Sequence, residues 1–136
     1  MISLFSKLFK RQLTLPDKWK SMRIKDTPLL SIDLELTSLD TKIAKITSIG
    51  WVKGENHSID LSSAFYTVIR ASGDLQQSPV IHGLTARDLL KGEHIKNVIG
   101  QLQAFASSHV WVLHNASLDM QVLDKLANNL RIPKFK

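Results

Sequence analysis

Residues 31–40, SIDLELTSLD, carry two carboxylates inside a predicted β-strand. The residues alternate between two faces, with Leu30, Ile32 and Leu34 on one and Ser31, Asp33 and Glu35 on the other. Because residues two apart on a strand share a face, Asp33 and Glu35 are expected side by side at the end of an apolar run. Like charges placed together repel, so another interaction must offset the repulsion between the two carboxylates.

The bulk composition limits the class of protein. At 136 residues the chain forms at most one modest domain, and its 43% hydrophobic and 22% charged residues are ordinary for a globular protein. It has no cysteine, which excludes disulfides and thiolate metal sites and is compatible with a reducing cytoplasm. Its apolar stretches are too short for an integral membrane segment.

The positive charge is concentrated at the N-terminus. The chain has 18 basic and 12 acidic residues. Residues 1–25 hold seven basic residues and one acidic residue, so the rest of the chain holds eleven of each. We therefore divide the chain into a basic amphipathic arm, residues 1–27, and a domain, residues 28–136. The arm is either a solvated extension that packs a few apolar residues on the domain or a basic helix that binds a membrane or a partner.

The pattern of the domain predicts three strands in an antiparallel meander. After the strand at 29–36, residues 39–54 read as a second strand that ends in a turn at 54–56. Residues 57–70 read as a third, in which Ile59, Leu61, Ser63 and Phe65 alternate with their neighbours. Residues 71–79, ASGDLQQSP, have the composition of a loop.

From Glu93 the apolar period becomes helical. One face of the predicted helix holds Ile95, Val98, Ile99, Leu102, Phe105 and Ala106. Residues 110–113, VWVL, predict a strand buried on both faces, and Ser117 is the expected cap of a second helix. The fold class is therefore α/β, with a meander followed by a helix, a strand and a helix; Trp51, Phe105 and Trp111 are expected in its core.

Three segments in this order resemble the DEDD exonucleases. These are RNase H-like 3′–5′ exonucleases typified by RNase T and by the proofreading epsilon subunit of bacterial replicative DNA polymerase. Asp33 and Glu35 match the Asp-x-Glu of their first motif, and His114, Asn115 and Asp119 match their second. Residues 82–85, HGLT, are similar to a His-Gly-Ile-Thr segment of the epsilon-like branch.

The resemblance implies a site for two Mg²⁺ or Mn²⁺ ions. Asp33 would bridge both ions, Glu35 would hold the ion that activates water, and Asp119 would hold the ion beside the leaving oxygen. Hard divalent cations prefer carboxylate ligands, and a pair of ions can stabilise both oxygens of a phosphodiester displacement. Cations would also explain why the chain tolerates adjacent carboxylates. Taken singly, each acid is more simply a turn, cap or salt-bridge residue.

The resemblance also implies contacts to the substrate. They would come from Leu36 and Thr37 after the first strand, from His82, and from Asn115. The residues His114 and Asn115 are also expected to shape the turn between strand and helix. Taken alone, His82 reads as a histidine that makes loop hydrogen bonds.

The chain departs from the family pattern in several places. Leu36 and Ser38 stand where the family usually has Thr and Gly, and Leu118 stands where it has an aromatic residue. The third motif, a His followed five positions later by an Asp, is absent because no His lies beyond Asp119. The spacing of His114 and Asp119 imitates that motif, but the strand-turn-helix context fits the second. We therefore expect an RNase H-like domain that lacks its C-terminal strand and helices.

The resulting hypothesis is a metal-dependent 3′–5′ exonuclease of the proofreading or repair type, acting on DNA rather than RNA. Residues 1–136 alone are expected to be weakly active or inactive, because the general base is missing. A DNA polymerase or a sliding clamp is a conceivable partner, since residues 12–16, QLTLP, loosely resemble a clamp-docking motif. Two alternatives stay open: a non-catalytic module that binds nucleic acid or the replisome, and an α/β domain whose acids are coincidental.

Overall fold

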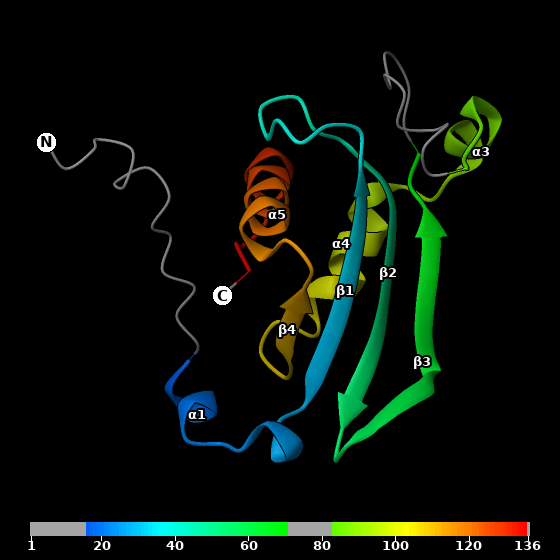
Figure 1. Cartoon of the computed structure of the whole chain (residues 1–136). Coiled ribbons are helices and arrows are strands. Elements are labelled where there is room, and N and C mark those ends of the chain that lie inside the picture. Colours follow the sequence, from blue (N-terminus) through cyan, green and yellow to red (C-terminus); the bar gives the residue numbers. More distant parts are fainter. Residues whose placement is uncertain (1–15, 71–82, 136) are drawn as a thin grey trace, which may run out of the picture.

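A four-stranded mixed sheet forms the centre of the molecule (Figure 1). The structure is a computed structural model and describes residues 16–70 and 83–135. The strands are β1 (Leu29–Leu36), β2 (Ile46–Glu55), β3 (Ser58–Val68) and β4 (Val110–Leu113), in the spatial order β3-β2-β1-β4. Strands β1, β2 and β3 are antiparallel in succession, and β4 lies parallel to β1. The predicted meander and crossover are therefore confirmed.

The helices are short except for the last one. They are α1 (Asp17–Lys20), the 3₁₀ helix η2 (Ile24–Asp26), α3 (Ala86–Lys91), α4 (Ile95–Gln103) and α5 (Ala116–Leu130). In the view of Figure 1, α4 lies behind β1 and β2, and α5 lies beside β1 above β4. Within the described residues no helix has the length and apolarity needed to cross a bilayer, and no strand or helix follows α5.

The core lies on the α4 side of the sheet. One face of β1 contributes Leu30, Ile32 and Leu34, and α4 contributes Val98, Ile99 and Leu102, at the spacing expected of a helical face. From β2 and β3, Trp51 and Phe65 stack with their ring centroids 4.1 Å apart. The other face of the sheet, which we call the open face, holds the exposed residues Ser31, Asp33 and Tyr66.

Strand β2 begins at Ile46, seven residues later than predicted. Residues 37–45 form a loop in which Asp40 Oδ1 accepts the Lys42 N–H at 2.9 Å, and the Asp40 carbonyl accepts the Ala44 N–H at 2.9 Å. Thr37 and Lys45 close the loop, because the Thr37 N–H donates to the Lys45 carbonyl at 2.9 Å. An Asp side chain that binds the backbone two residues on competes with strand pairing, which accounts for the error.

The hairpin between β2 and β3 also turns later than predicted. Glu55 pairs with Ser58, and the two residues between them, Asn56 and His57, have φ of 52° and 61°. Positive φ at both central residues defines a type I′ turn, whose twist matches that of the flanking strands. Asn accepts this conformation more readily than most residues, so the turn lies at 56–57 and not at 54–56.

Three further predictions need correction. Strand β4 is not buried on both faces, because Val112 lies on the open face and is 46% exposed. Ser117 lies inside α5, and Asn115 is the N-cap in its place. Helix α3 was not predicted, although Thr85 and Asp88 form a capping box before it. Trp51, Phe105 and Trp111 do belong to the core or pack against it, as expected.

Candidate functional site

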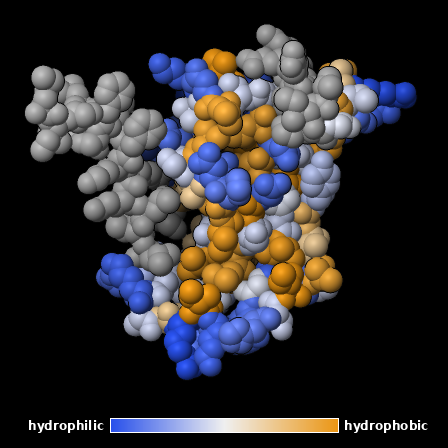
Figure 2. All heavy atoms as spheres, in the orientation of Figure 1, coloured by the Kyte–Doolittle hydropathy of each residue, from blue (hydrophilic) through white to orange (hydrophobic). Residues whose placement is uncertain are grey.

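The site begins with Asp33 on the open face of β1. Alternation along the strand sends Ile32 and Leu34 into the core and leaves the Asp33 side chain in solvent. Across the sheet, Asp33 pairs with Gly50 of β2, which in turn pairs with Tyr66 of β3. Figure 2 shows this side of the molecule, where hydrophobic residues fill much of the middle between hydrophilic ends. An exposed carboxylate in such surroundings is available to a ligand.

The second acid, Asp119, lies in the first turn of α5 and is only 6% exposed. Asn115 holds that turn in place, because its Oδ1 accepts the Leu118 N–H at 3.5 Å and its carbonyl accepts the Asp119 N–H at 2.9 Å. The cap therefore positions a buried carboxyl group at the start of the helix.

Electrostatics connect the two acids. Burial raises the pKa of Asp119, the backbone hydrogen bond with Asn115 lowers it, the carboxylate of Asp33 raises it again, and His114 lowers it. A like charge nearby disfavours the ionised form of a carboxyl group. The charge of Asp33 on β1 thus acts on the carboxyl group of Asp119 on α5, although the two segments lie far apart in the sequence.

The third predicted ligand, Glu35, lies two residues along β1 on the same face as Asp33 and is half-buried. The register of β1 against β2 shifts directly after Glu35, and Thr47 Oγ1 donates to the Glu35 carbonyl at 3.1 Å. Within residues 16–70 and 83–135, no three Asp, Glu or His side chains are gathered closely enough to hold a metal ion. The predicted ligands Asp33, Glu35 and Asp119 therefore do not form a cluster of the described residues that is close enough to hold a metal ion.

The residues predicted to contact substrate have different surroundings. Leu36 packs against the core, and Thr37 is buried, where its Oγ1 accepts the Lys45 N–H at 3.0 Å. Asn115 is exposed and serves as the cap of α5, and His114 beside it is exposed as well. His82 lies outside the described residues, as do residues 12–15 of the clamp-like motif and most of the basic arm.

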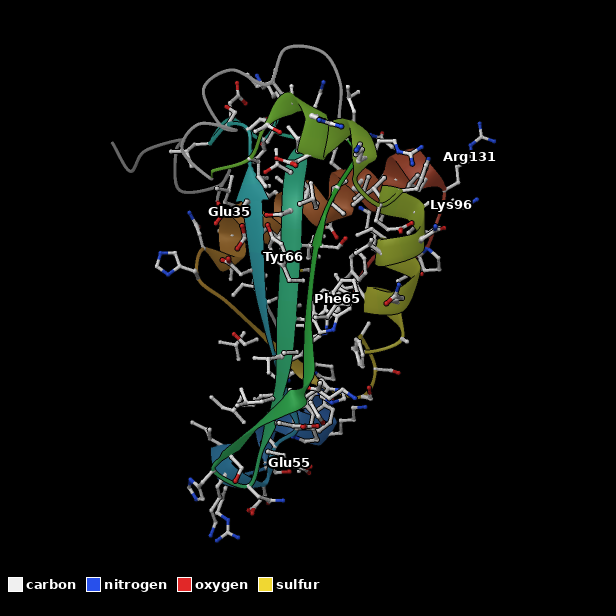
Figure 3. All side chains as sticks on the ribbon, turned by 90° about the vertical axis from the view of Figure 1, so that its right-hand side faces the viewer. Glu35, Glu55, Phe65, Tyr66, Lys96 and Arg131 are labelled. Atoms are coloured by element: carbon white, nitrogen blue, oxygen red, sulfur yellow. The ribbon has the colours of Figure 1, made fainter. Side chains whose placement is uncertain are left out.

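The row formed by Asp33, Gly50 and Tyr66 was not predicted from the sequence. The signal was present in the alternation of the three strands, but using it requires the register, which the turn at 56–57 sets. Figure 3 shows that the labelled side chains of Phe65 and Tyr66 leave β3 on opposite sides, with Phe65 toward α4. Tyr66 is therefore a neighbour of the acidic site and not a core residue.

A sheet of this topology, in which a strand parallel to β1 leads into α5, is that of an RNase H-like α/β domain of the exonuclease type. The model of the RNase T exonuclease family matches residues 30–131. The chain therefore belongs to this family, whose members are DEDD-type 3′–5′ exonucleases.

Solved structures of exonuclease I share the fold. E. coli exonuclease I in complex with a dT13 oligonucleotide superposes with a TM-score of 0.70 at 10% sequence identity, covering 81% of this chain and 25% of that one. A second exonuclease I structure gives a TM-score of 0.71 at 9% identity, with 81% and 26% covered. This chain thus spans about a quarter of the exonuclease I chains, and at such identity the likeness concerns the fold alone. No curated protein sequence matches the chain.

Proposed function

We propose that the domain removes 3′-terminal nucleotides from DNA in a reaction that depends on a divalent metal ion. The observation that supports this proposal is the electrostatic effect of the exposed Asp33 on the buried carboxyl group of Asp119, whose pKa it raises. Two apposed carboxylates are unfavourable alone and become favourable when a cation lies between them. Membership of the exonuclease family supports the same reading.

The donor set suits Mg²⁺ or Mn²⁺. Carboxylate oxygens are the ligands these hard cations prefer, and Asp33 and Asp119 would hold the ion, with Glu35 as the nearest further carboxylate on the same face of β1. When bound, such ions supply charge stabilisation to the attacking and leaving oxygens of a phosphodiester. The burial of Asp119 would keep its oxygen fixed, while the exposure of Asp33 would leave its own oxygens accessible to substrate.

The activity of residues 1–136 alone is expected to be low. The family's third motif contributes the histidine that acts as general base, and no histidine follows His114 in this sequence. Loss of a general base typically lowers a rate by about 10²- to 10⁴-fold. We therefore expect slow trimming of single strands rather than rapid digestion.

The test uses the full chain, a single-stranded DNA labelled at its 5′ end, and a titration of Mn²⁺. We expect a ladder of products shortened from the 3′ end that is lost in Asp33→Ala and in Asp119→Ala. The control is Asp17→Asn, because the Asp17 side chain is 95% exposed on α1, where it pairs with Lys20. Cleavage that persists in Asp33→Ala would refute the proposal. An RNA of the same sequence tests the preference for DNA.

A second function, binding of nucleic acid without cleavage, is favoured by a separate pocket. It has a volume of about 610 Å³ and lies between the 37–45 loop, the start of α4 and the second half of α5. Its lining is largely apolar, includes Lys42, Lys45, Arg70 and Lys125, and contains no acidic residue from the described parts of the chain. Lys125 also donates to the carbonyls of Thr41 and Lys42, and these hydrogen bonds hold its ammonium group at the rim of the pocket.

Salt dependence separates the two functions. If phosphates bind at this pocket, Arg70→Ala should reduce the slope of log K against log salt concentration by about one and leave metal-dependent cleavage unchanged. Binding that is insensitive to Asp33→Ala, together with no cleavage in Mn²⁺, would favour the binding module over the enzyme.

A further inference from the structure

Tyr66 is the only tyrosine of the chain, and its ring stands in solvent. It is 64% exposed, whereas every other Phe and Trp in the described part of the chain is buried or half-buried. The neighbouring Phe65 is stacked on Trp51 on the core side, so Tyr66 cannot turn inward without breaking that stack. An aromatic ring held in water on a rigid sheet is a preformed surface for another flat apolar group.

The ring of Tyr66 lies against the backbone of Gly50. Gly50 lies between the two residues in the row across the sheet, since it pairs with Asp33 on one side and with Tyr66 on the other. A Cβ atom placed on Gly50 would lie 3.7 Å from Cδ2 of Tyr66 and 3.3 Å from the Phe65 carbonyl oxygen. The tyrosine ring therefore reaches over the bare backbone of Gly50, and the glycine leaves a shallow floor between the ring and the carboxylate.

The spacing fits a nucleic-acid strand. Two strand separations place the Cα atoms of Asp33 and Tyr66 about 10 Å apart. Successive stacked nucleotides advance by about 3.4 Å, so the ring lies within roughly three nucleotides of a phosphate that a divalent ion would hold at Asp33. Aromatic side chains beside such a path bind bases of any sequence, because every base has a π-face.

We propose that Tyr66 is a base-stacking residue that holds the 3′-terminal part of a single strand against the open face, over the floor provided by Gly50. The proposal rests on the proposed nuclease function and deepens it. A base in a duplex is already stacked between its neighbours, so this contact favours unpaired 3′ ends. Tyr66 is a positioning residue, because it touches the substrate at a distance from the reacting phosphate.

The experiment measures binding of the full chain to a single-stranded DNA that carries 2-aminopurine at one of its last four 3′ positions, with Ca²⁺ present. Stacking on Tyr66 should quench the fluorescence at one or two of these positions. In Tyr66→Ala the quenching should disappear and the affinity should fall by roughly 5- to 150-fold. Tyr66→Phe keeps the ring and should behave like the wild type, whereas Tyr66→Leu keeps apolar area without a π-face and should behave like Tyr66→Ala.

The matched control is Leu61→Ala, which removes another exposed side chain from β3, one that is 78% exposed. It should leave both affinity and quenching unchanged. Unaltered quenching and affinity in Tyr66→Ala would overturn the inference, even where Asp33→Ala abolishes cleavage and the proposed function holds. A wild-type chain that neither binds nor cleaves the strand would overturn the proposed function and the stacking role together.

Discussion

The charge of Asp33 on β1 acts on the carboxyl group of Asp119 on α5, and this relationship connects two segments that are remote in sequence. Burial raises the pKa of the Asp119 carboxyl group, and the charge of Asp33 raises it further. The first prediction follows from the sign of this effect. The folded chain holds the Asp119 proton more tightly than the unfolded chain, so the resulting stability is full below the ordinary aspartate pKa of 3.8 and is lost as the pH rises through the folded value.

At neutral pH the raised pKa of Asp119 therefore lowers the stability of the fold, and Asp119→Asn should unfold at a higher temperature than the wild type in the presence of EDTA. The difference should vanish near about pH 3, where the carboxyl group is protonated in both states. The control is Asp88→Asn. Hydrogen bonds from Thr85 lower the pKa of Asp88, so this substitution should destabilise the fold at neutral pH. Equal melting temperatures for Asp119→Asn and wild type at neutral pH would contradict the prediction.

Divalent ions should offset the loss of folding stability that Asp119 causes at neutral pH. An ion that binds only the folded chain adds RT ln(1 + [L]/Kd), which is about 1.4 kcal/mol at ten times Kd. We expect Mg²⁺ or Mn²⁺ to raise the melting temperature of the wild type and of Asp17→Asn, and to have no such effect on Asp33→Asn. Thermal unfolding with and without EDTA measures this. A rise of the same size in Asp33→Asn would place the ions elsewhere.

The cap of α5 can be separated from a contact to substrate. Asn115→Ala removes the side chain that accepts the Leu118 N–H, and the loss of such a cap costs about 0.5–2 kcal/mol. Because Asp119 lies in the capped turn, the affinity for Mn²⁺ should fall as well. Asn115→Ser should restore both properties, since serine is also a good N-cap. Failure of Asn115→Ser to recover ion binding, with stability restored, would indicate that the amide itself contacts the ligand.

The core on the α4 side should be the stability-determining part of the fold. Leu102 is fully buried between α4 and the sheet, so Leu102→Ala should lower the free energy of unfolding by about 2–5 kcal/mol. Leu61→Ala, at an exposed position of β3, should change it by less than about 0.5 kcal/mol. Urea unfolding followed by tryptophan fluorescence measures both. Similar values for the two variants would show that α4 does not carry the core.

The sequence predicted the elements better than their boundaries. Alternation in β1 and the helical spacing in α4 reflect burial of one face, and burial is what the apolar pattern encodes. The start of β2 was missed because Asp40 diverts the backbone into hydrogen bonds of its own. The exposure of Val112 depends on the position of β4 at the edge of the sheet, and strand order is not a local property.

In the candidate site, too, the local features could be predicted from the sequence and the non-local ones could not. Asp33 and Asp119 could be singled out from motifs, but their approach depends on how α5 leaves β4, which a local pattern does not specify. Tyr66 could not be placed beside Asp33 without the register of two strand pairs. A hairpin shifted by one residue would send Tyr66 into the core and Phe65 to the open face.

The capping turn of α5 begins two residues after β4 ends, and β4 lies at the edge of the described sheet. Its outer backbone groups form a template to which another extended segment can hydrogen-bond. If strand addition at that edge stiffened the connection on which Asp119 depends, it would change the affinity of Asp33 and Asp119 for an ion, and the ion would change the affinity of the edge for the added strand by the same factor.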